Sequence, residues 1–369
     1  MPLPSVRPVH GGNLAWAAQL AQCPPSVILD FSASINPLGP PASALDAIAS
    51  HLTDLCHYPD PRYTELRRSI AQFHSISPDW ILPGNGAAEL LTWSCRELAT
   101  LPQTHRLVPA FGDYGRALDA FGAQTVDWPI PLRDGCAIPE RERCAITQNR
   151  LIPIPATATG GLLLNNPHNP TGQLFSVAQI LPLLDQFALV VIDEAFMDFL
   201  PPAEQESLID RVADFPNLVI LRSLTKFYSL PGLRLGYAIA HPDRLKRWQQ
   251  WRDPWAVNVL AAAVGEVVLQ DVEFQQKTWN WLKLARSQLF DGFQQLGLNP
   301  FPGAANFLLV ECEASVELQR QLLQQHRILI RDCLSFAQLG DRFFRVAVRT
   351  EPENQRLIDG LAAIFQHGG

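Results

Sequence analysis

The sequence shows no arrangement of cysteines or histidines that is typical of a disulfide framework or a metal site. Its seven cysteines are scattered, none forms a CxxC pair, and their number is odd. The nine histidines show no HExxH or other metal-ligand spacing. We therefore expect no metal ion and no disulfide framework, and we expect a reducing compartment, the cytoplasm. The cysteines are Cys23, Cys56, Cys95, Cys136, Cys144, Cys312 and Cys333.

Long apolar runs and basic clusters are missing as well. No uninterrupted apolar stretch approaches ~20 residues, so a membrane span is not expected. The N-terminus has no long apolar stretch next to a basic region, which argues against a signal peptide. The formal net charge is −7 and no basic cluster stands out, so nucleic-acid binding is not expected either. Phosphorylated ligands stay open, because a few local arginines suffice to bind them.

The length of the chain, 369 residues, allows one large domain and a smaller one. Residues 1–42 are rich in Pro, Gly and Ser, and we expect an extended arm that contains one short strand, Val27–Phe31. The large domain is expected over 43–260 and the small domain over 261–369, with the arm packing against the small domain.

Apolar, β-branched runs separated by amphipathic helical patterns indicate strands that are buried on both faces, which is the α/β signature. These runs are Gly161–Leu164, Leu189–Ile192, Leu218–Leu221 and Leu235–Ala240. A helix is expected from Pro242, and a long helical region with a possible break from about Leu260 to Leu296. The expected elements after it are a strand at Asn306–Glu311, a helix at Glu317–His326, a strand at Phe343–Val348 and a helix at Glu353–Phe365.

Two loops have the composition of ligand-binding loops. Pro83–Glu89 consists largely of small residues and leads into a helical pattern, so its N–H groups could approach an anion at a helix N-terminus. Asn165–Gly172 follows a strand and contains two X-Pro units, and rigid loops at the carboxyl ends of strands are where open α/β sheets bind ligands. Each segment could also be a purely structural turn.

Two further segments carry ionisable groups at strand ends. Asp193 ends a predicted strand, where it could cap a helix or pair with the protonated ring nitrogen of a cofactor. Lys226 lies in Arg222–Tyr237, between two predicted strands. Burial and nearby cations such as Arg234 lower the pKa of a lysine, and the free amine is a nucleophile. Ser223 and Arg234 could hold a phosphate, whereas a lysine in a surface loop is the alternative.

Two arginines stand four residues apart near the C-terminus. Arg345 and Arg349 lie in the strand-like segment Phe344–Arg349, so they are expected on one face. A planar guanidinium binds carboxylate or phosphate with two hydrogen bonds, and two such groups suit a substrate with two anionic groups. A solvated edge strand is the alternative.

These segments, taken in order, resemble the fold-type I PLP (pyridoxal 5′-phosphate) enzymes of the aspartate aminotransferase superfamily. Asn-Pro-Thr-Gly, Asp-Glu-Ala-aromatic, and Ser-x-x-Lys with Arg eight residues later carry the resemblance, which runs from about residue 26 to the C-terminus. It implies an α/β fold whose large domain has a mostly parallel seven-stranded sheet, with a smaller α/β C-terminal domain. It also implies PLP as cofactor and a homodimer with sites near the subunit interface.

The resemblance implies roles for individual residues. Lys226 would hold PLP as a Schiff base and later return a proton to Cα of the substrate, and Asp193 would pair with the pyridine nitrogen. Asn169 would lie near the ring oxygen and Phe111 would stack on the ring. The cofactor phosphate would be held by Ser223, Arg234, the amides of Gly86 and Ala87, and Tyr58 of the neighbouring subunit.

The same resemblance implies that Arg345 takes the α-carboxylate of a substrate. We further expect Arg331 and Arg349 to take a substrate phosphate, with His10 as a further candidate. Asn36 and Asn169 complete the set of candidate substrate contacts.

Two families of the superfamily compete for the activity: L-threonine-O-3-phosphate decarboxylases of cobalamin synthesis and histidinol-phosphate aminotransferases. We expect the decarboxylase activity, because five strings are more similar to the decarboxylases: His10–Asn13, Asp30–Gly39, Gly84–Glu89, Ile330–Cys333 and Phe344–Arg349. Aminotransferases usually have Tyr at the position of Phe196, and a phenyl ring cannot make the hydrogen bond of that hydroxyl. A non-catalytic PLP-binding module is disfavoured, because the lysine, the aspartate and the arginines are all present.

Overall fold

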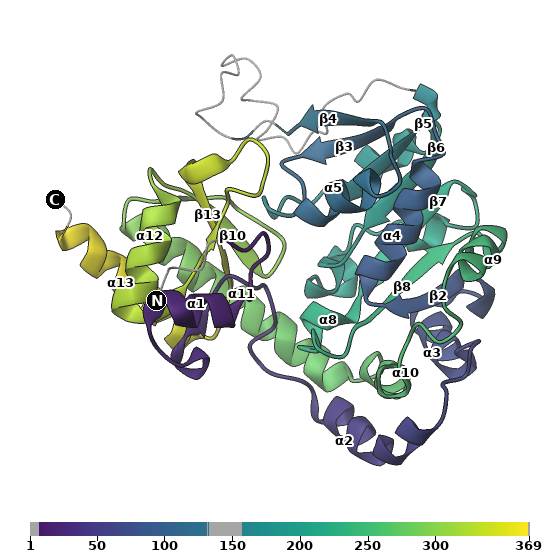
Figure 1. Cartoon of the computed structure of the whole chain (residues 1–369), viewed down its shortest axis with the longest axis horizontal. Coiled ribbons are helices and arrows are strands. Elements are labelled where there is room, and N and C mark those ends of the chain that lie inside the picture. Colours follow the sequence, from purple (N-terminus) through teal and green to yellow (C-terminus); the bar gives the residue numbers. More distant parts are fainter. Residues whose placement is uncertain (1–6, 131, 133–156, 368–369) are drawn as a thin grey trace.

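The structure is a computed structural model that describes residues 7–130, 132 and 157–367. Figure 1 shows two parts side by side, a large sheet flanked by helices and a smaller α/β part. The smaller part contains both the C-terminal elements and the N-terminal helix α1 (Leu14–Ala21). The long helix α11 (Val272–Gln295) runs from one part to the other.

The large sheet has seven strands in the order β2-β8-β7-β6-β5-β3-β4. The strands from β7 to β4 are parallel to one another, and β8 is antiparallel to both of its neighbours. The predicted mostly parallel seven-stranded sheet is thus confirmed. Its strands are β2 (Ile81–Asn85), β3 (Thr104–Val108), β4 (Thr125–Pro129), β5 (Thr157–Asn165), β6 (Phe187–Asp193), β7 (Leu218–Ser223) and β8 (Leu235–Ala240).

Apolar side chains cover both faces of this sheet. Along β6, Val190 and Ile192 belong to one buried cluster, and Leu189 and Val191 belong to another, because successive side chains of a strand point to opposite faces. Helices α3, α10 and α11 contribute to the first cluster, and α4, α5 and α9 contribute to the second. The helices of the large part are α2 (Ala42–Ser50), α3 (Thr64–His74), α4 (Ala87–Leu98), α5 (Gly112–Asp119), α7 (Val177–Ile180), α8 (Leu224–Phe227), α9 (Pro242–Trp251) and α10 (Val259–Val268).

The smaller part is built on an antiparallel sheet in the order β12-β13-β10-β9. The break expected in the long helical region is present between α10 and α11, where Asp271 accepts a hydrogen bond from the Phe274 N–H at 3.0 Å and caps α11. After α11, the smaller part contains β9 (Asn299–Pro300), β10 (Phe307–Glu311), α12 (Ser315–Gln321), β12 (Arg331–Asp332), β13 (Phe343–Ala347) and α13 (Glu351–His367).

The prediction of an extended N-terminal arm is wrong, because the arm contains helix α1. Asn13 caps this helix by accepting the Trp16 N–H at 2.9 Å. Ala17, Ala18 and Ala21 are buried in a cluster that includes Leu323 and Leu329. The Pro and Gly residues that flank α1 obscured an alanine-rich segment of high helix propensity.

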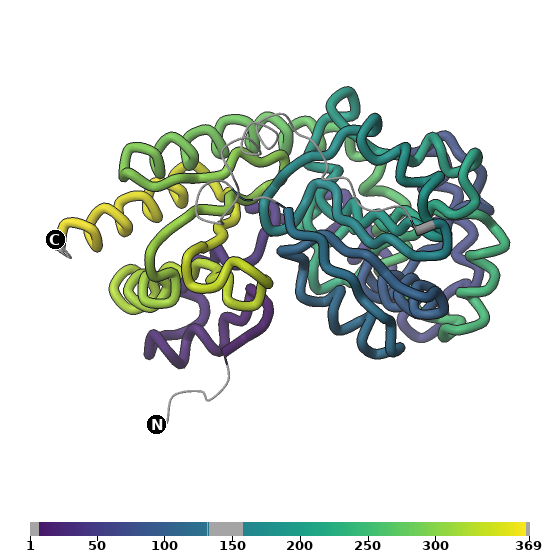
Figure 2. The backbone as a smooth tube through the Cα atoms, turned by 90° about the horizontal axis from the view of Figure 1, so that it is seen from above, coloured from purple at the N-terminus to yellow at the C-terminus, as the bar shows by residue number. Residues whose placement is uncertain are grey.

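The arm also adds a strand beside the smaller part. Strand β1 (Leu29–Asp30) pairs in parallel with β11 (Ile328–Leu329). Figure 2 shows the purple N-terminal segment lying along the yellow-green C-terminal elements. The domain limits at residues 42 and 260 remain predictions.

Within the described residues, no helix has the length and apolar character needed to cross a membrane. Five cysteines are free thiols, whereas Cys136 and Cys144 lie outside the described residues.

A buried ion cluster joins the ends of β6 and β7. Arg222 Nε lies 2.9 Å from Glu194 Oε2, and Arg222 Nη1 lies 2.5 Å from Asp198 Oδ1. Arg222 and Glu194 are each only 1% exposed. Burial raises the pKa of both carboxyls, and the charge of Arg222 opposes that rise. The cluster fixes the relative position of the two strand ends, whose last residues are Asp193 in β6 and Ser223 in β7.

The variant Arg222→Met should destabilise the folded chain by about 3–5 kcal/mol at neutral pH, because it leaves two buried carboxylates without their cation. Arg222 opposes the rise in the pKa of both carboxyls, so without it these pKa values should rise further. The variant therefore gains more stability from protonation as the pH falls than the unmodified protein does. The loss should therefore shrink between about pH 7 and about pH 5. Urea unfolding across that range measures both effects.

The matched control is Glu317→Ala, which removes an ion pair with Arg320 whose two side chains are each 48% exposed. It should cost less than about 1 kcal/mol. If Arg222→Met were as stable as this control, the cluster would not be what holds the two strand ends.

Candidate active site

The loops singled out in the sequence meet at the carboxyl edge of the large sheet. Asn165 at the end of β5 pairs with Asp193 at the end of β6, and Asp193 pairs with Leu221 of β7. Lys226 lies in α8, which begins directly after β7. Neighbouring parallel strands therefore deliver the Asn-Pro-Thr-Gly loop, the aspartate and the lysine to one place.

Lys226 is held in apolar surroundings close to charged groups. Its Nζ lies 5.1 Å from the centroid of the Phe196 ring. Burial lowers the pKa of Lys226, and Arg234 and Arg345 lower it further, whereas Asp193 opposes the shift. A lower pKa leaves more of the amine neutral, which is the form that attacks a carbonyl carbon.

Asp193 is bound by one donor on each oxygen. Tyr114 donates its hydroxyl to Oδ2 at 2.7 Å, and the Ala195 N–H donates to Oδ1 at 3.0 Å. Burial raises the pKa of Asp193, and the hydrogen bond from Tyr114 and the charge of Lys226 oppose the rise. Tyr114 was not among the predicted site residues. The signal that could have found it is its spacing: it follows Phe111 by three residues at the start of a helix, so the two side chains share one face.

The four predicted phosphate-binding residues of this chain converge across β2, β7 and β8. Gly236 of β8 pairs with both Gly84 and Ser223. A Cβ at Gly236 would lie 2.5 Å from the Ala87 N, and a Cβ at Gly86, which has φ +76°, would lie 2.4 Å from Arg234 Nη2. Because these two glycines have no side chain, the Arg234 guanidinium lies against Gly86 and the first amide of α4 lies against β8. A guanidinium beside a helix N-terminus suits a phosphate.

Arg345 projects from β13 of the smaller part toward this edge. It donates to Asn169 Oδ1 and, at 3.4 Å, to the Ser32 carbonyl, and its Nε has no hydrogen-bond partner within the described residues. Its guanidinium carbon lies 4.9 Å from the centroid of the Phe307 ring. Burial lowers the pKa of Arg345 to about 10, with a contribution from Arg331.

Arg331 is a second buried cation near Arg345. It donates to the carbonyls of Pro8 and Val9 in the N-terminal arm and, at 2.5 Å, to Ser335 Oγ. Its neighbour Asp332 is paired with Arg7 at 3.0 Å. Within 7–130, 132 and 157–367, neither Arg331 nor Arg345 forms an ion pair with a carboxylate. Buried cations without an anion are costly, so the pair favours an anionic ligand.

The remaining predicted substrate residues lie in three different settings. Arg349 is already paired with Glu353 at 2.8 Å, so its charge is compensated. His10 is exposed, with its ring centroid 5.6 Å from that of Phe111. Asn36 does not offer a donor to a substrate, because both N–H groups of its Nδ2 are used, toward the Phe227 carbonyl at 2.8 Å and Thr278 Oγ1 at 2.9 Å.

Asn36 instead supports the lysine. Its backbone N–H donates to the Lys226 carbonyl at 3.1 Å. Tyr58 is 78% exposed, and its ring stacks on Trp255 with centroids 4.3 Å apart.

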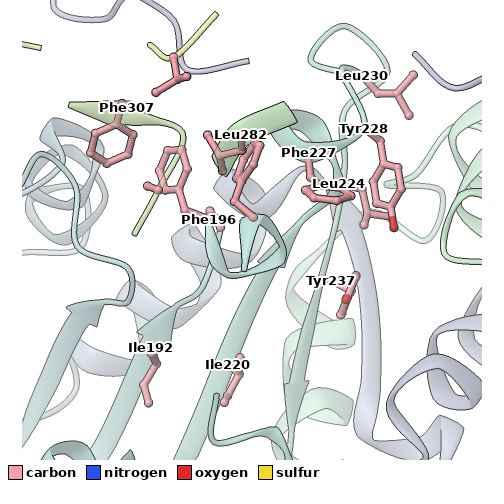
Figure 3. Packing of buried hydrophobic residues seen from close by; sticks show 14 of the residues in the cluster. Ile192, Phe196, Ile220, Leu224, Phe227, Tyr228, Leu230, Tyr237, Leu282 and Phe307 are labelled. Carbon is pink, nitrogen blue, oxygen red and sulfur yellow. The ribbon is translucent and has the colours of Figure 1, made fainter. Parts of the chain in front are cut away.

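An aromatic layer closes the site on one side. The rings of Phe196 and Phe307 meet edge to face, with centroids 5.0 Å apart. Figure 3 shows these rings and Phe227 beyond the ends of the strands that carry Ile192 and Ile220. The layer joins the large sheet to β10 and keeps the surroundings of Lys226 apolar.

The sheet topology, and a lysine beside an aspartate at the sheet's carboxyl edge, are those of the fold-type I PLP-dependent enzymes. The chain belongs to the aminotransferase class I and II family, whose profile matches residues 26–361. The predicted fold and superfamily are thereby confirmed.

Individual relatives divide between two activities. The chain is 39% identical over 364 residues to the threonine-phosphate decarboxylase of Salmonella typhimurium, covering 96% of each chain. It is 32% identical to the histidinol-phosphate aminotransferase of Symbiobacterium thermophilum, covering 90% of this chain and 89% of that one. Among solved structures, the histidinol-phosphate aminotransferase from Clostridium acetobutylicum superposes with a TM-score of 0.81 at 27% identity, covering 92% of this chain and all of that one.

The variant Gly236→Ala should weaken PLP binding roughly tenfold or more. Its methyl group would push the Ala87 amide out of the phosphate site, and the lost hydrogen bond to a charged phosphate contributes about 1.5–3 kcal/mol to binding. A spectroscopic titration of the apoprotein with PLP measures the dissociation constant. The matched control is Gly232→Ala, since a Cβ at that position has no neighbour within 4 Å. Equal affinities of the two variants would contradict the assignment of this phosphate site.

Proposed function

We propose that this chain is a PLP-dependent lyase that decarboxylates L-threonine O-3-phosphate to (R)-1-amino-2-propanol O-2-phosphate in cobalamin biosynthesis. The observation that carries the proposal is a pair of buried arginines without a carboxylate partner among the described residues: Arg345, whose charge acts on Lys226, and its cross-strand neighbour Arg331. A substrate with one carboxylate and one phosphate supplies two matching anions. The 39% identity to a threonine-phosphate decarboxylase supports the same activity.

The cofactor residues fit PLP in kind and position. When bound, PLP supplies an electron sink for the bond that breaks at Cα. Lys226 Nζ would hold its aldehyde carbon, Asp193 would face the ring nitrogen, and Phe111 would lie on the ring. Asn169 would stand near the ring oxygen. The phosphate would be held by Ser223, Arg234 and the amides of Gly86 and Ala87.

The way Arg345 holds the substrate would determine which bond at Cα breaks. Only the Cα bond perpendicular to the ring plane overlaps the π system, so the residue that holds the carboxylate decides between loss of CO₂ and loss of the Cα proton. We assign the α-carboxylate to Arg345, whose Nε has no hydrogen-bond partner in the part of the chain that the structure describes. With PLP bound as the electron sink, the carboxylate held by Arg345 would leave as CO₂, and the Lys226 amine would supply the proton that takes its place at Cα.

Arg331 is the better candidate for the substrate phosphate. Glu353 already compensates the charge of Arg349, whereas the partners of Arg331 are neutral oxygens of Pro8, Val9 and Ser335. A phosphate dianion would replace these neutral acceptors with a charged one, which makes a stronger hydrogen bond. His10 follows Val9 in the arm and is a further candidate contact.

Transamination of histidinol phosphate is the alternative. Its support is the aminotransferase relative at 32% identity and the structural match with a TM-score of 0.81. Against it stands Phe196, which lies beside Lys226 and has no hydroxyl where aminotransferases usually have Tyr. A non-catalytic PLP-binding module would have no need for two buried arginines, Arg345 and Arg331, to hold the anions of a substrate.

We further propose a cytoplasmic homodimer. Trp255, whose ring stacks on Tyr58, is exposed in the single chain, and so are three leucines of α2 and of the turn after it, which both contact α10. Exposed apolar clusters of this kind mark subunit interfaces. The exposed Tyr58 would then reach the cofactor phosphate of the second subunit. The apolar side chains are Leu45, Leu52, Leu55 and Trp255. The scattered, odd-numbered cysteines favour the cytoplasm.

Incubating the PLP-loaded protein with L-threonine O-3-phosphate should release CO₂, because both anions of this substrate find an arginine. L-threonine without phosphate should react much more slowly, since Arg331 then stays unpaired. The measurement is trapped CO₂ together with the amine product. No CO₂ release, combined with glutamate formation from histidinol phosphate and 2-oxoglutarate in a parallel assay, would reverse the order of the two activities.

A further inference from the structure

We propose that Tyr114 is a positioning residue that fixes both protein contacts of the cofactor ring, Asp193 at the ring nitrogen and Phe111 at the ring face. The inference rests on the cofactor placement of the proposed function. It does not depend on which reaction follows. It assigns a role to a residue outside the motifs that carry the family resemblance.

The hydrogen bonds of Asp193 define the orientation of its carboxylate. Tyr114 Oη donates to Oδ2 at 2.7 Å from α5, and the Ala195 N–H donates to Oδ1 at 3.0 Å from the loop after β6. Tyr114 and Asp193 are both buried, at 2% and 8% exposure, so water does not replace these donors easily. Donors from two separate elements, one on each oxygen, prevent the carboxylate from rotating about its own axis.

The ring of Tyr114 supports the second contact. Phe111 precedes α5, and Tyr114 lies one turn later on the same face. The two rings meet edge to face at 87°, with centroids 5.7 Å apart. One side chain therefore touches both the aromatic ring and the carboxylate that would contact PLP, and it couples their positions.

The hydroxyl also favours the charged form of Asp193. A hydrogen bond donated to a carboxylate stabilises its ionised state, whereas burial destabilises it. The groups that act on Asp193 are Tyr114, Lys226, the Ala195 amide and the more distant carboxyl of Asp113. Burial, with Asp193, Cys95 and Asp113, raises the pKa of Tyr114 well above its ordinary value, so Tyr114 keeps its proton and remains a donor.

The test compares Tyr114→Phe with the unmodified protein, both loaded with PLP carrying a ¹⁵N label in the ring. Removing the hydroxyl makes the Asp193 carboxylate more basic, so the proton it shares with the ring nitrogen should move toward Asp193. At neutral pH the ¹⁵N resonance should therefore shift from the protonated toward the unprotonated pyridine position. The PLP dissociation constant should rise roughly tenfold, as expected for one charge-assisted hydrogen bond.

The matched control is Tyr237→Phe, which removes an equally buried hydroxyl that bonds His74 Nε2 at 2.8 Å rather than Asp193. It should leave both readouts unchanged. Tyr114→His, which can restore an N–H donor, should recover part of the ¹⁵N shift, whereas a merely structural role would leave the histidine and phenylalanine variants alike.

Two results would overturn the role of Tyr114 alone. One is a Tyr114→Phe protein that binds PLP with the unmodified ¹⁵N shift. The other is failure of both Tyr114 variants to fold while Tyr237→Phe folds, since that would show a structural residue only. Failure of the unmodified protein to bind PLP is a different outcome, because it would remove the proposed function itself.

Discussion

The interaction on which the site depends is the one between the amine of Lys226 and the carboxylate of Asp193. Asp193 is buried and Lys226 is partly buried, and each opposes the effect of burial on the pKa of the other. Asp193 ends β6, and Lys226 lies in α8 directly after the adjacent parallel strand β7. Ion pairs of Arg222 with Glu194 and Asp198 join the two strand ends. A cofactor with an aldehyde and a basic ring nitrogen can use both groups at once only if the strand ends keep this arrangement.

The charges around that pair favour anionic ligands. Arg234, Arg345 and Arg331 surround a site in which Asp193 is the carboxylate assigned to the cofactor. Arg345 and Arg331 are buried, and their present acceptors are neutral oxygens. A cofactor phosphate near Arg234 and a doubly anionic substrate near the other two arginines would balance these cations. Phe196 and Phe307 keep the region apolar, which strengthens each of these charge interactions.

Much of this could be predicted from the sequence, because burial on both faces leaves a continuous apolar pattern. The strands around Val190, Val219 and Ala238 were found for that reason. The motifs led to Lys226 and Asp193. By contrast, β3 and β4 were missed: β3 contains His105 and Arg106, and alternating exposed positions break the apolar run of β4.

Other features depend on contacts that no local pattern encodes. The strand β2 was hidden by Pro83 and Gly84, which look like a loop until Gly236 is seen to pair with Gly84. Tyr114 and the donors of Asn36 could be understood only from their partners, which lie 79 and 191 residues away in the chain. The helix α1 was missed because the Pro and Gly residues on either side of it indicate an extended segment, although its own alanines favour a helix.

The chain has four lysines, and Lys246, Lys277 and Lys283 are exposed, whereas Lys226 is not. This makes chemical trapping of the linkage between PLP and the protein unusually clear. The PLP-loaded protein is reduced with borohydride, digested, and mapped by mass spectrometry. We expect one pyridoxyl group, on the peptide that contains Lys226, and no label there in a Lys226→Ala protein. A label on any of the three exposed lysines with Lys226 unmodified would contradict the assignment on which the site rests.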